Sequence, residues 1–408
     1  MEQTTLGLRA NARQFTLLVI VNAFVGGMVG LERTLLPEIA EQELGVAATS
    51  AILAFIVVFG ISKALTNYYT GALANKWGRK RLLVLGWLIG LPVPLILMFA
   101  PSWNWIIFAN VLLGINQGLA WSSTVVMKID LVGDKQRGLA MGLNEFAGYL
   151  AVALVAFGTS WIAAEYGLRP YPFYLGIAIA VMGLLLSWIW VKDTVHHARN
   201  EAPAPDQIRL KQPFWDTTWK DRVLGSVSQA GLINNLNDGM VWGIFPVLLA
   251  QRDFTLEQIG LITAVYPGVW GIGQLFTGAM ADHFPKRGLL FGGMLLQAVA
   301  LGGLLWATSL THFLGLSSIL GFGTALVYPT FLATIAERTH PLDRANSIGT
   351  FRLWRDLGYA IGAVLTGIIA DLFHIEAAIA GIAGLTLISA LILRWRIPTP
   401  LKAHSPTT

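Results

Sequence analysis

The sequence contains no cysteine and little charge, since only 12% of its 408 residues are Asp, Glu, Lys or Arg. Without cysteine there is no disulfide framework, no thiolate metal site and no cysteine nucleophile. Soluble domains are about 25% charged, so this chain lacks the charge that a water-facing surface of its size requires. The deficit excludes an ordinary soluble enzyme, a disordered chain and a nucleic-acid-binding protein with a basic face.

Apolar residues make up 55% of the chain and gather into runs of the length needed to cross a bilayer, which is about 20 residues for a helix. Continuous runs of this kind disfavour a strand barrel, whose strands alternate. We therefore expect an all-α membrane protein with twelve transmembrane helices. The runs cover 15–36, 50–70, 82–100, 104–126, 139–163, 172–191, 223–249, 256–278, 288–307, 313–335, 346–372 and 377–394.

The basic residues predict the orientation. With the N-terminus inside, 22 of the 28 lysines and arginines fall in cytoplasmic segments, and only Arg169 and Arg252 lie outside. This bias predicts that both termini are cytoplasmic, in a multi-pass protein of the plasma (inner) membrane. The net charge of +5 is then a consequence of topology, and no nucleic-acid partner is needed to explain it.

The polar stretch 192–222 carries three prolines and separates the first six runs from the last six. It predicts a cytoplasmic linker between two bundles, 1–191 and 223–408.

The two bundles resemble each other at a constant offset of 207 residues. This offset indicates a duplicated six-helix unit, and related halves are typical of transporters whose site lies between the repeats near the membrane midplane. It superposes Gly71 on Gly278, Asn75 on Asp282, Arg79 on Lys286, Asp130 on Glu337, Arg137 on Arg344, Gly142 on Gly349 and Glu145 on Arg352.

One segment carries a family resemblance. Gly71-Ala-Leu-Ala-Asn-Lys-Trp-Gly-Arg-Lys-Arg81 resembles the loop 2–3 signature of the major facilitator superfamily, G-x-L-a-D-r-x-G-R-r, and 278–287 resembles its weaker echo in loop 8–9. The resemblance covers the whole chain and implies two pseudo-symmetric six-helix bundles that transport by alternating access. The chain departs from the family pattern at Asn75, where the signature has Asp, and at Asn110, where many proton-coupled members have Arg. It also lacks the helix-five Gly-Pro pair of drug antiporters. These departures disfavour drug/proton antiport of the usual kind.

Ionisable side chains within a bilayer cost about 3 kcal/mol or more each and are functional candidates by default. This chain has four acids and four bases inside the predicted spans, a balance that suggests pairing. Helical spacing adds polar and aromatic neighbours on the same faces. The candidates for substrate contact or proton coupling are Glu32, Arg33, Lys63, Asn110, Gln117, Trp121, Glu145, Tyr149, Asp238, Tyr266, Trp270, Arg352, Arg355 and Asp356.

Several of these residues also have a purely structural interpretation. Arg352 and Asp356 are one helical turn apart and could neutralise each other. Glu32 and Arg33 could extend to the outer interface, and Lys63 could extend to the cytoplasmic edge. Glu145 and Asp238 lie deeper in their helices, which favours proton coupling or substrate contact.

The family resemblance also implies a cytoplasmic gate of charge relays that closes the inner side while the protein is open outward. Solvated charges that merely orient the protein are the alternative, but their repetition at equal spacing favours a gate. The predicted gate residues are Gly71, Asn75, Gly78, Arg79, Asp130, Arg137, Asp282, Lys286, Glu337 and Arg344.

The sequence therefore predicts a monomeric, secondary active transporter of a small polar or anionic organic solute. No G-x-x-x-x-G-K-[ST] loop occurs, so ATP is not the energy source, and the membrane carboxylates favour coupling to protons. Arginines favour an anion, whereas the aromatic residues leave efflux of a drug or toxicant by proton antiport as the alternative. A non-transporting membrane sensor is a remote third possibility. The seven histidines lie in loops or at span edges, so we expect no enzyme, no metal site and no cofactor.

Overall fold

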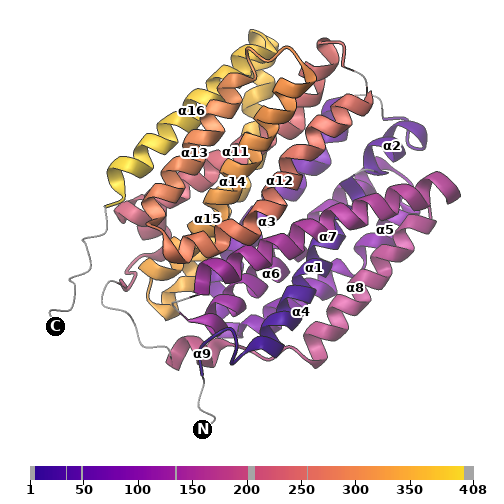
Figure 1. The fold of residues 1–408 in the computed structure, drawn as a ribbon. Coiled ribbons are helices and arrows are strands. Elements are labelled where there is room, and N and C mark those ends of the chain that lie inside the picture. The colour runs from indigo at the N-terminus through magenta and orange to yellow at the C-terminus, as the bar shows by residue number, and fades with distance from the viewer. Residues whose placement is uncertain are drawn as a thin grey trace.

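The computed structural model describes residues 5–33, 35–46, 49–133, 136–200, 207–254 and 256–398. Within these ranges the chain is helical, and its one isolated β-bridge joins Ile208 to Thr339. Long helices lie side by side in two groups, the first indigo to magenta and the second orange to yellow (Figure 1). The first described helix begins, and the last ends, at the same end of the molecule, which we name the terminus-bearing end.

The first group comes from the N-terminal half of the chain. It consists of α1 (Ala12–Arg33), α2 (Leu35–Gln42), α3 (Thr49–Trp77), α4 (Arg79–Gly90), α5 (Val93–Phe99), α6 (Trp103–Val132), α7 (Arg137–Tyr166) and α8 (Tyr171–Ile189). The second group consists of α11 (Arg222–Gln251), α12 (Leu256–His283), α13 (Lys286–Gly303), α14 (Leu310–Arg338), α15 (Pro341–Leu372) and α16 (Ile375–Arg396).

The helix bounds differ from the predicted runs at several ends. The run 82–100 is interrupted between Gly90 and Val93, because Pro92 has no N–H with which to continue the helix. The run 15–36 is divided into α1 and the short α2. Helix α6 continues past 126 to Val132, and α15 begins at Pro341 rather than at 346. These two extensions bring charged residues that we had assigned to loops into the helices.

The predicted linker has structure of its own. It contains α9 (Val195–Asn200), α10 (Pro213–Trp215) and the π-helical turn η2 (Asp216–Lys220). Thr194 donates to Asp130 of α6 at 2.8 Å, and Ile208 pairs with the turn between α14 and α15. The linker is therefore attached to both groups of helices at the terminus-bearing end.

Many helices present apolar faces outward. Eight stretches within the described residues are long and apolar enough to cross a membrane: 12–32, 79–99, 103–132, 137–166, 171–189, 310–338, 341–372 and 375–396. Phe99, Phe157 and Trp306 are 71%, 74% and 77% exposed, a surface that suits lipid and not water. The chain is thus a multi-pass membrane protein, while the number of twelve crossings and the side of the termini stay predictions.

The two groups of helices touch most closely at two glycine crossings. In the first, between α3 and α15, a Cβ on Gly71 would lie 2.8 Å from the Cα of Gly349. In the second, between α7 and α12, a Cβ on Gly278 would lie 2.8 Å from the Cα of Gly142. No side chain fits at such separations, so glycine lets the backbones meet. The crossings are related by the repeat, since Gly71 matches Gly278 and Gly142 matches Gly349.

Candidate functional site

An ion pair joins the two halves in the middle of the molecule. The guanidinium Nη2 of Arg352 on α15 lies 3.6 Å from Oε1 of Glu145 on α7, and both side chains are fully buried. Glu145 Oε1 also accepts hydrogen bonds from the indole N–H of Trp121 at 3.1 Å and from the Asn144 amide at 2.6 Å. A buried charge is tolerated only when it is paired and hydrogen-bonded, so these contacts account for the presence of Glu145 there.

Arg352 does not pair with Asp356, which corrects that structural interpretation. Arg352 donates to the Ser122 hydroxyl at 3.0 Å, whereas Asp356 accepts from the neighbouring Arg355 Nε at 2.7 Å. Asn67 of α3 links the two, because it accepts from Ser122 and donates to Asp356. A continuous polar network therefore crosses between the halves at α3, α6 and α15.

Aromatic rings from both halves pack against this network. Tyr149 of α7 lies 4.2 Å from Trp270 of α12 between ring centroids and 5.6 Å from Trp121. Tyr266 stacks on Trp270 at 6.0 Å, and Tyr328 of α14 lies 5.7 Å from the same indole. The Trp270 N–H and the Tyr328 hydroxyl have no hydrogen-bond partner among the described residues.

Asp238 of α11 is a third buried carboxyl group, after Glu145 and Asp356. Tyr266 donates a hydrogen bond to its Oδ1, and its Oδ2 has no hydrogen-bond partner in the described part of the chain. No ion pair to Asp238 occurs among the described residues. Glu145 and Asp238 thus differ, because one is paired with an arginine and the other is held by a phenol.

Two lysines point into the same region. The ammonium of Lys63 lies 5.3 Å from the Trp121 ring and 5.5 Å from the Phe59 ring, so it faces inward and does not extend to the helix end. Lys128 was missed by sequence reasoning, because it follows the predicted end of its span. It is fully buried in α6 and donates to the Asn144 side chain.

We name these linked side chains the central cluster. Apart from the half-buried Lys63 and Tyr149, all of them are buried. The cluster consists of Lys63, Asn67, Trp121, Ser122, Lys128, Asn144, Glu145, Tyr149, Asp238, Tyr266, Trp270, Tyr328, Arg352, Arg355 and Asp356.

Four predicted residues are not connected to the cluster by a contact among the described side chains. Gln117 donates to the Val25 carbonyl of α1 at 2.8 Å, and Asn110 donates to Ile106 of its own helix, so both bonds stay within the N-terminal half. Glu32 is fully buried near the end of α1 and does not extend to an interface. The side chain of Arg33 lies outside the described residues.

A second amide network was also missed. Asn237 donates to Gln297 at 2.9 Å, Gln297 donates to Asn234 at 3.0 Å, and Thr386 donates to Asn237 at 2.8 Å. These bonds tie α11, α13 and α16 together within one half, which is a packing role. The cluster of Asn residues at 234–237 was the available signal.

At the terminus-bearing end, two repeat-related ion pairs stand at the predicted gate. Arg79 Nε lies 3.1 Å from Asp130 Oδ2 with both groups buried, and Lys286 lies 2.8 Å from Glu337 near the surface. Arg344 of the C-terminal half also approaches Asp130, at 3.9 Å. Asp130 therefore contacts arginines from both halves. The remaining predicted gate arginine, Arg137, is buried, with 2% of its surface exposed.

The two signature carboxylate positions behave differently. Asp282 of α12 accepts from the backbone N–H groups of Gly138 and Leu139 at 2.6 and 2.8 Å, across the interface at the start of α7. Its repeat partner Asn75 instead donates to the Leu342 carbonyl at the start of α15. A carboxylate at a helix N-terminus is favoured by the helix dipole, so only one of the two crossings has this stabilisation.

Gly78 explains a further part of the signature. Its φ is 83°, and the carboxylate of Asp193 lies 2.6 Å from the place a Cβ would take. Asp193 accepts there from the Lys80 N–H at 2.8 Å. Glycine is required because the backbone conformation and the close carboxylate both exclude a side chain.

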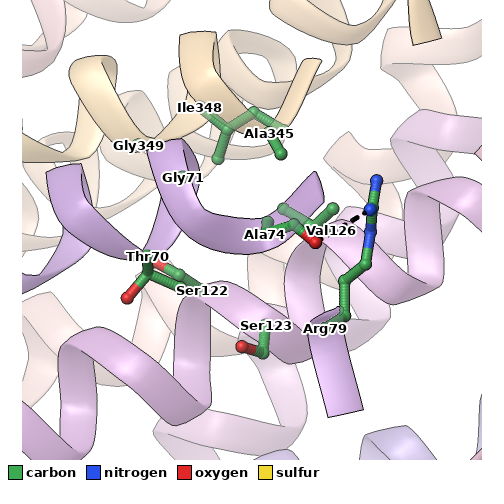
Figure 2. Close-up of a pocket in the computed structure, with 10 residues that line it drawn as sticks. All are labelled: Thr70, Gly71, Ala74, Arg79, Ser122, Ser123, Val126, Ala345, Ile348 and Gly349. Carbon is green, nitrogen blue, oxygen red and sulfur yellow. Dashed lines mark hydrogen bonds between the residues drawn. The ribbon is translucent and has the colours of Figure 1, made fainter. Parts of the chain in front are cut away.

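Figure 2 shows the hollow between the central cluster and these gate residues, lined by α3, α6 and α15. Arg79 stands at one side and donates to the Ala74 carbonyl at 3.1 Å. The space among the lining side chains is too narrow for a water molecule. Where α3, α6 and α15 meet, the two halves therefore leave no passage for water between the cluster and the gate residues.

Comparisons with known proteins agree with this architecture. The chain is 23% identical over 385 residues to the proton-coupled antiporter flippase LtaA of Staphylococcus epidermidis, and the match covers 91% of both chains. The human organic anion transporter MFSD10 superposes with a TM-score of 0.77 at 18% identity, over 93% of this chain and 99% of that one. The transporter FucP, solved in the outward conformation, gives 0.75 at 14% identity, over 96% and 100%.

The model of the Major Facilitator Superfamily matches residues 18–233 and 227–408. Together these two segments take in both helix groups and all of the central cluster. The chain belongs to the Major Facilitator Superfamily and is a transporter of that family.

Proposed function

We propose that this protein is a proton-coupled carrier of an amphipathic organic anion, which it moves by rocking its two helix bundles about the central cluster. The observation that carries the proposal is the buried Glu145–Arg352 pair, because it joins the halves beside aromatic rings contributed by both. A group shared by two bundles changes its surroundings when the bundles separate. Such a site is the natural place to couple binding to movement.

The charges of the cluster favour an anionic substrate. Within the described residues, the cluster contains four cationic side chains, Lys63, Lys128, Arg352 and Arg355, and three carboxyl groups, Glu145, Asp238 and Asp356. When Asp238 takes up a proton, two carboxylates remain for four cations. An anionic head group between the arginines would restore the balance, and guanidinium groups bind carboxylates and phosphates through paired hydrogen bonds.

The aromatic part of the cluster favours an apolar portion on the same substrate. Trp121, Tyr149, Trp270 and Tyr328 offer ring faces next to the cationic groups. Large rings contribute strongly to the binding of apolar surface. The names of two similar proteins, a flippase and an organic anion transporter, support an amphipathic anion.

Asp238 is the proposed proton-binding group, and Glu145 the proposed sensor of bundle separation. Asp238 has a phenol partner and no cation paired with it among the described residues, so it can change protonation without breaking an ion pair. The LtaA relatives are proton-coupled antiporters, which supports protons as the coupling ion here.

The proposed topology has twelve crossings in bundles 1–191 and 223–408, with the 192–222 linker and both termini in the cytoplasm. The terminus-bearing end is then the cytoplasmic side. The Arg79–Asp130 and Lys286–Glu337 pairs form its gate while substrate exchanges on the other side.

The proposal is tested by flux into proteoliposomes that contain the purified protein. A fluorescent aromatic carboxylate, a lipophilic cation and a sugar are each offered with and without a pH gradient. We expect the pH gradient to drive flux of the carboxylate, and we expect no flux of the sugar. Flux that is indifferent to the gradient would contradict proton coupling. Gradient-driven flux of the cation alone would support the second candidate, drug efflux by proton antiport, which the aromatic rings also favour.

A further inference from the structure

Lys128 is a buried cation that contributes to the charge balance of the central cluster but has no step of its own in the proposed transport cycle. It is fully buried in α6, and its ammonium donates to the side-chain oxygen of Asn144. Its repeat partner, 207 residues later, is the aliphatic Ile335, which is also buried. At this position, therefore, the C-terminal half has an apolar side chain and the N-terminal half has a charged one.

Asn144 connects the lysine to the ion pair between the halves. Its oxygen accepts from Lys128, while its amide N–H donates to Glu145 Oε1 at 2.6 Å. The orientation of this amide follows from its two partners, since an ammonium group can only donate and a carboxylate can only accept; the Asn144 backbone is held separately, because its carbonyl accepts from Asn22 at 2.8 Å. A cation, a fixed amide and the carboxylate thus form one chain of hydrogen bonds.

The partners of Glu145 divide between the two bundles. Lys128, Asn144 and Trp121 belong to the same half as Glu145, whereas Arg352 belongs to the other. Separation of the bundles removes Arg352 and leaves Lys128 in place. A buried carboxylate that loses its only counter-ion is strongly destabilised, so the cycle requires a cation that stays behind.

We infer that Lys128 is a positioning residue that acts through Asn144 as the resident counter-ion of Glu145, and that it sets how easily the Arg352 contact breaks. This inference rests on the proposed alternating access. In the closed state Glu145 faces Arg352 directly, and in the open state its charge is balanced by Lys128. Without Lys128, Glu145 would stay paired with Arg352, and the terminus-bearing end would stay closed.

The natural absence of cysteine makes the test direct, because spin labels react only where a cysteine is introduced. Labels at Lys76→Cys and His283→Cys, two exposed repeat-related positions on α3 and α12, report the separation of the halves at the terminus-bearing end. We expect Lys128→Met to reduce the long-distance population at least fivefold, and Lys128→Arg to restore most of it. In the Glu145→Gln background, Lys128→Met should change the distribution less than twofold.

The other possible outcomes each support or contradict the role of Lys128. An equal shift with and without Glu145→Gln, or no shift at all, would overturn the role of Lys128. If Lys128→Met does not fold but the Lys128→Met/Glu145→Gln double variant does, the coupling is supported; if both fail, Lys128 is structural and the inference is wrong. A single distance in the wild-type protein under all gradients would contradict alternating access itself, which separates failure of the proposed function from failure of this inference.

Discussion

Glu145 and Arg352 occupy equivalent positions in the two repeats, 207 residues apart, and form a buried ion pair of 3.6 Å across the interface. The pair lies between the aromatic rings of both halves and the Asn67–Ser122–Asp356 network. A change in either residue therefore alters contacts in both bundles.

Replacing Arg352 by Met removes one member of the pair. Breaking a buried pair from one side costs about 3–5 kcal/mol, so we expect a clearly lower unfolding temperature and a loss of transport. The Arg352→Met/Glu145→Gln double variant should regain most of the stability but not the transport. Thermal unfolding in detergent and flux in proteoliposomes measure the two effects. Equal unfolding temperatures for the single and double variants would show that the two side chains do not interact.

Replacing Gly278 by Ala disturbs the crossing of α7 and α12. The new Cβ would lie 2.7 Å from the Gly138 carbonyl oxygen and 2.8 Å from the Gly142 Cα, and these backbone atoms cannot yield without moving a helix. We expect the halves to separate at the terminus-bearing end. A cysteine introduced at the buried Ser123 should then react at least tenfold faster with a water-soluble maleimide.

The control for this variant is Gly271→Ala on the same helix. Nothing lies within 4 Å of a Cβ at Gly271, and alanine in a helix interior is favoured over glycine by about 1 kcal/mol. The labelling rate should therefore stay unchanged. Equal acceleration by both variants would mean that α12 responds to any added methyl group and that the crossing is not a special contact.

Replacing Asp238 by Asn removes the proposed proton-binding group and keeps the size of the side chain. We expect exchange of solute between the two sides to persist, while accumulation driven by a pH gradient is lost. Tyr266→Phe is the matched control, because it removes only the hydroxyl that donates to Asp238 and leaves the carboxyl group able to titrate. Gradient-driven accumulation by Asp238→Asn would assign proton coupling elsewhere.

Replacing Asn75 by Asp removes the amide that donates to the Leu342 carbonyl and places a carboxylate against that oxygen. Loss of one hydrogen bond costs about 0.5–1.5 kcal/mol, which corresponds to a population of the open terminus-bearing end that is about two- to tenfold higher. The reactivity of the Ser123→Cys probe should rise by that factor. Asp282→Asn weakens the contact with the N–H groups of Gly138 and Leu139 and should also raise it, and slower labelling of either variant would contradict a closing role for these contacts.

Patterns in the sequence account for the family and for most of the site. The repeat offset correctly aligned Arg79 with Lys286 and Asp130 with Glu337, and both pairs are in contact. Pairing of a residue with its repeat partner, as in Glu145–Arg352, could not be derived from spacing. This pairing depends on how the two bundles face each other. The periodicity of residues within one bundle gives no information about that arrangement.

Other features were missed for equally physical reasons. Hydropathy ended the fourth span at 126, so Lys128 fell outside it, although the helix continues to Val132. Asn110 and Gln117 lie seven residues apart on α6 and were predicted to face the site, but they donate to Ile106 of the same helix and to Val25 of α1, within the N-terminal half. A polar stripe shows that a helix has a polar neighbour without showing on which side of the interface that neighbour lies.

The two glycine crossings have a consequence for the symmetry of the molecule. The second long helix of each half meets the fifth of the other, which is the arrangement of a self-complementary interface about a two-fold axis. If the two halves were identical, a residue near that axis would face its own copy, so a carboxylate would meet a carboxylate. Because the halves are different segments of one chain, the equivalent positions of Glu145 and Arg352 carry opposite charges. The central ion pair therefore depends on the departure from exact two-fold symmetry.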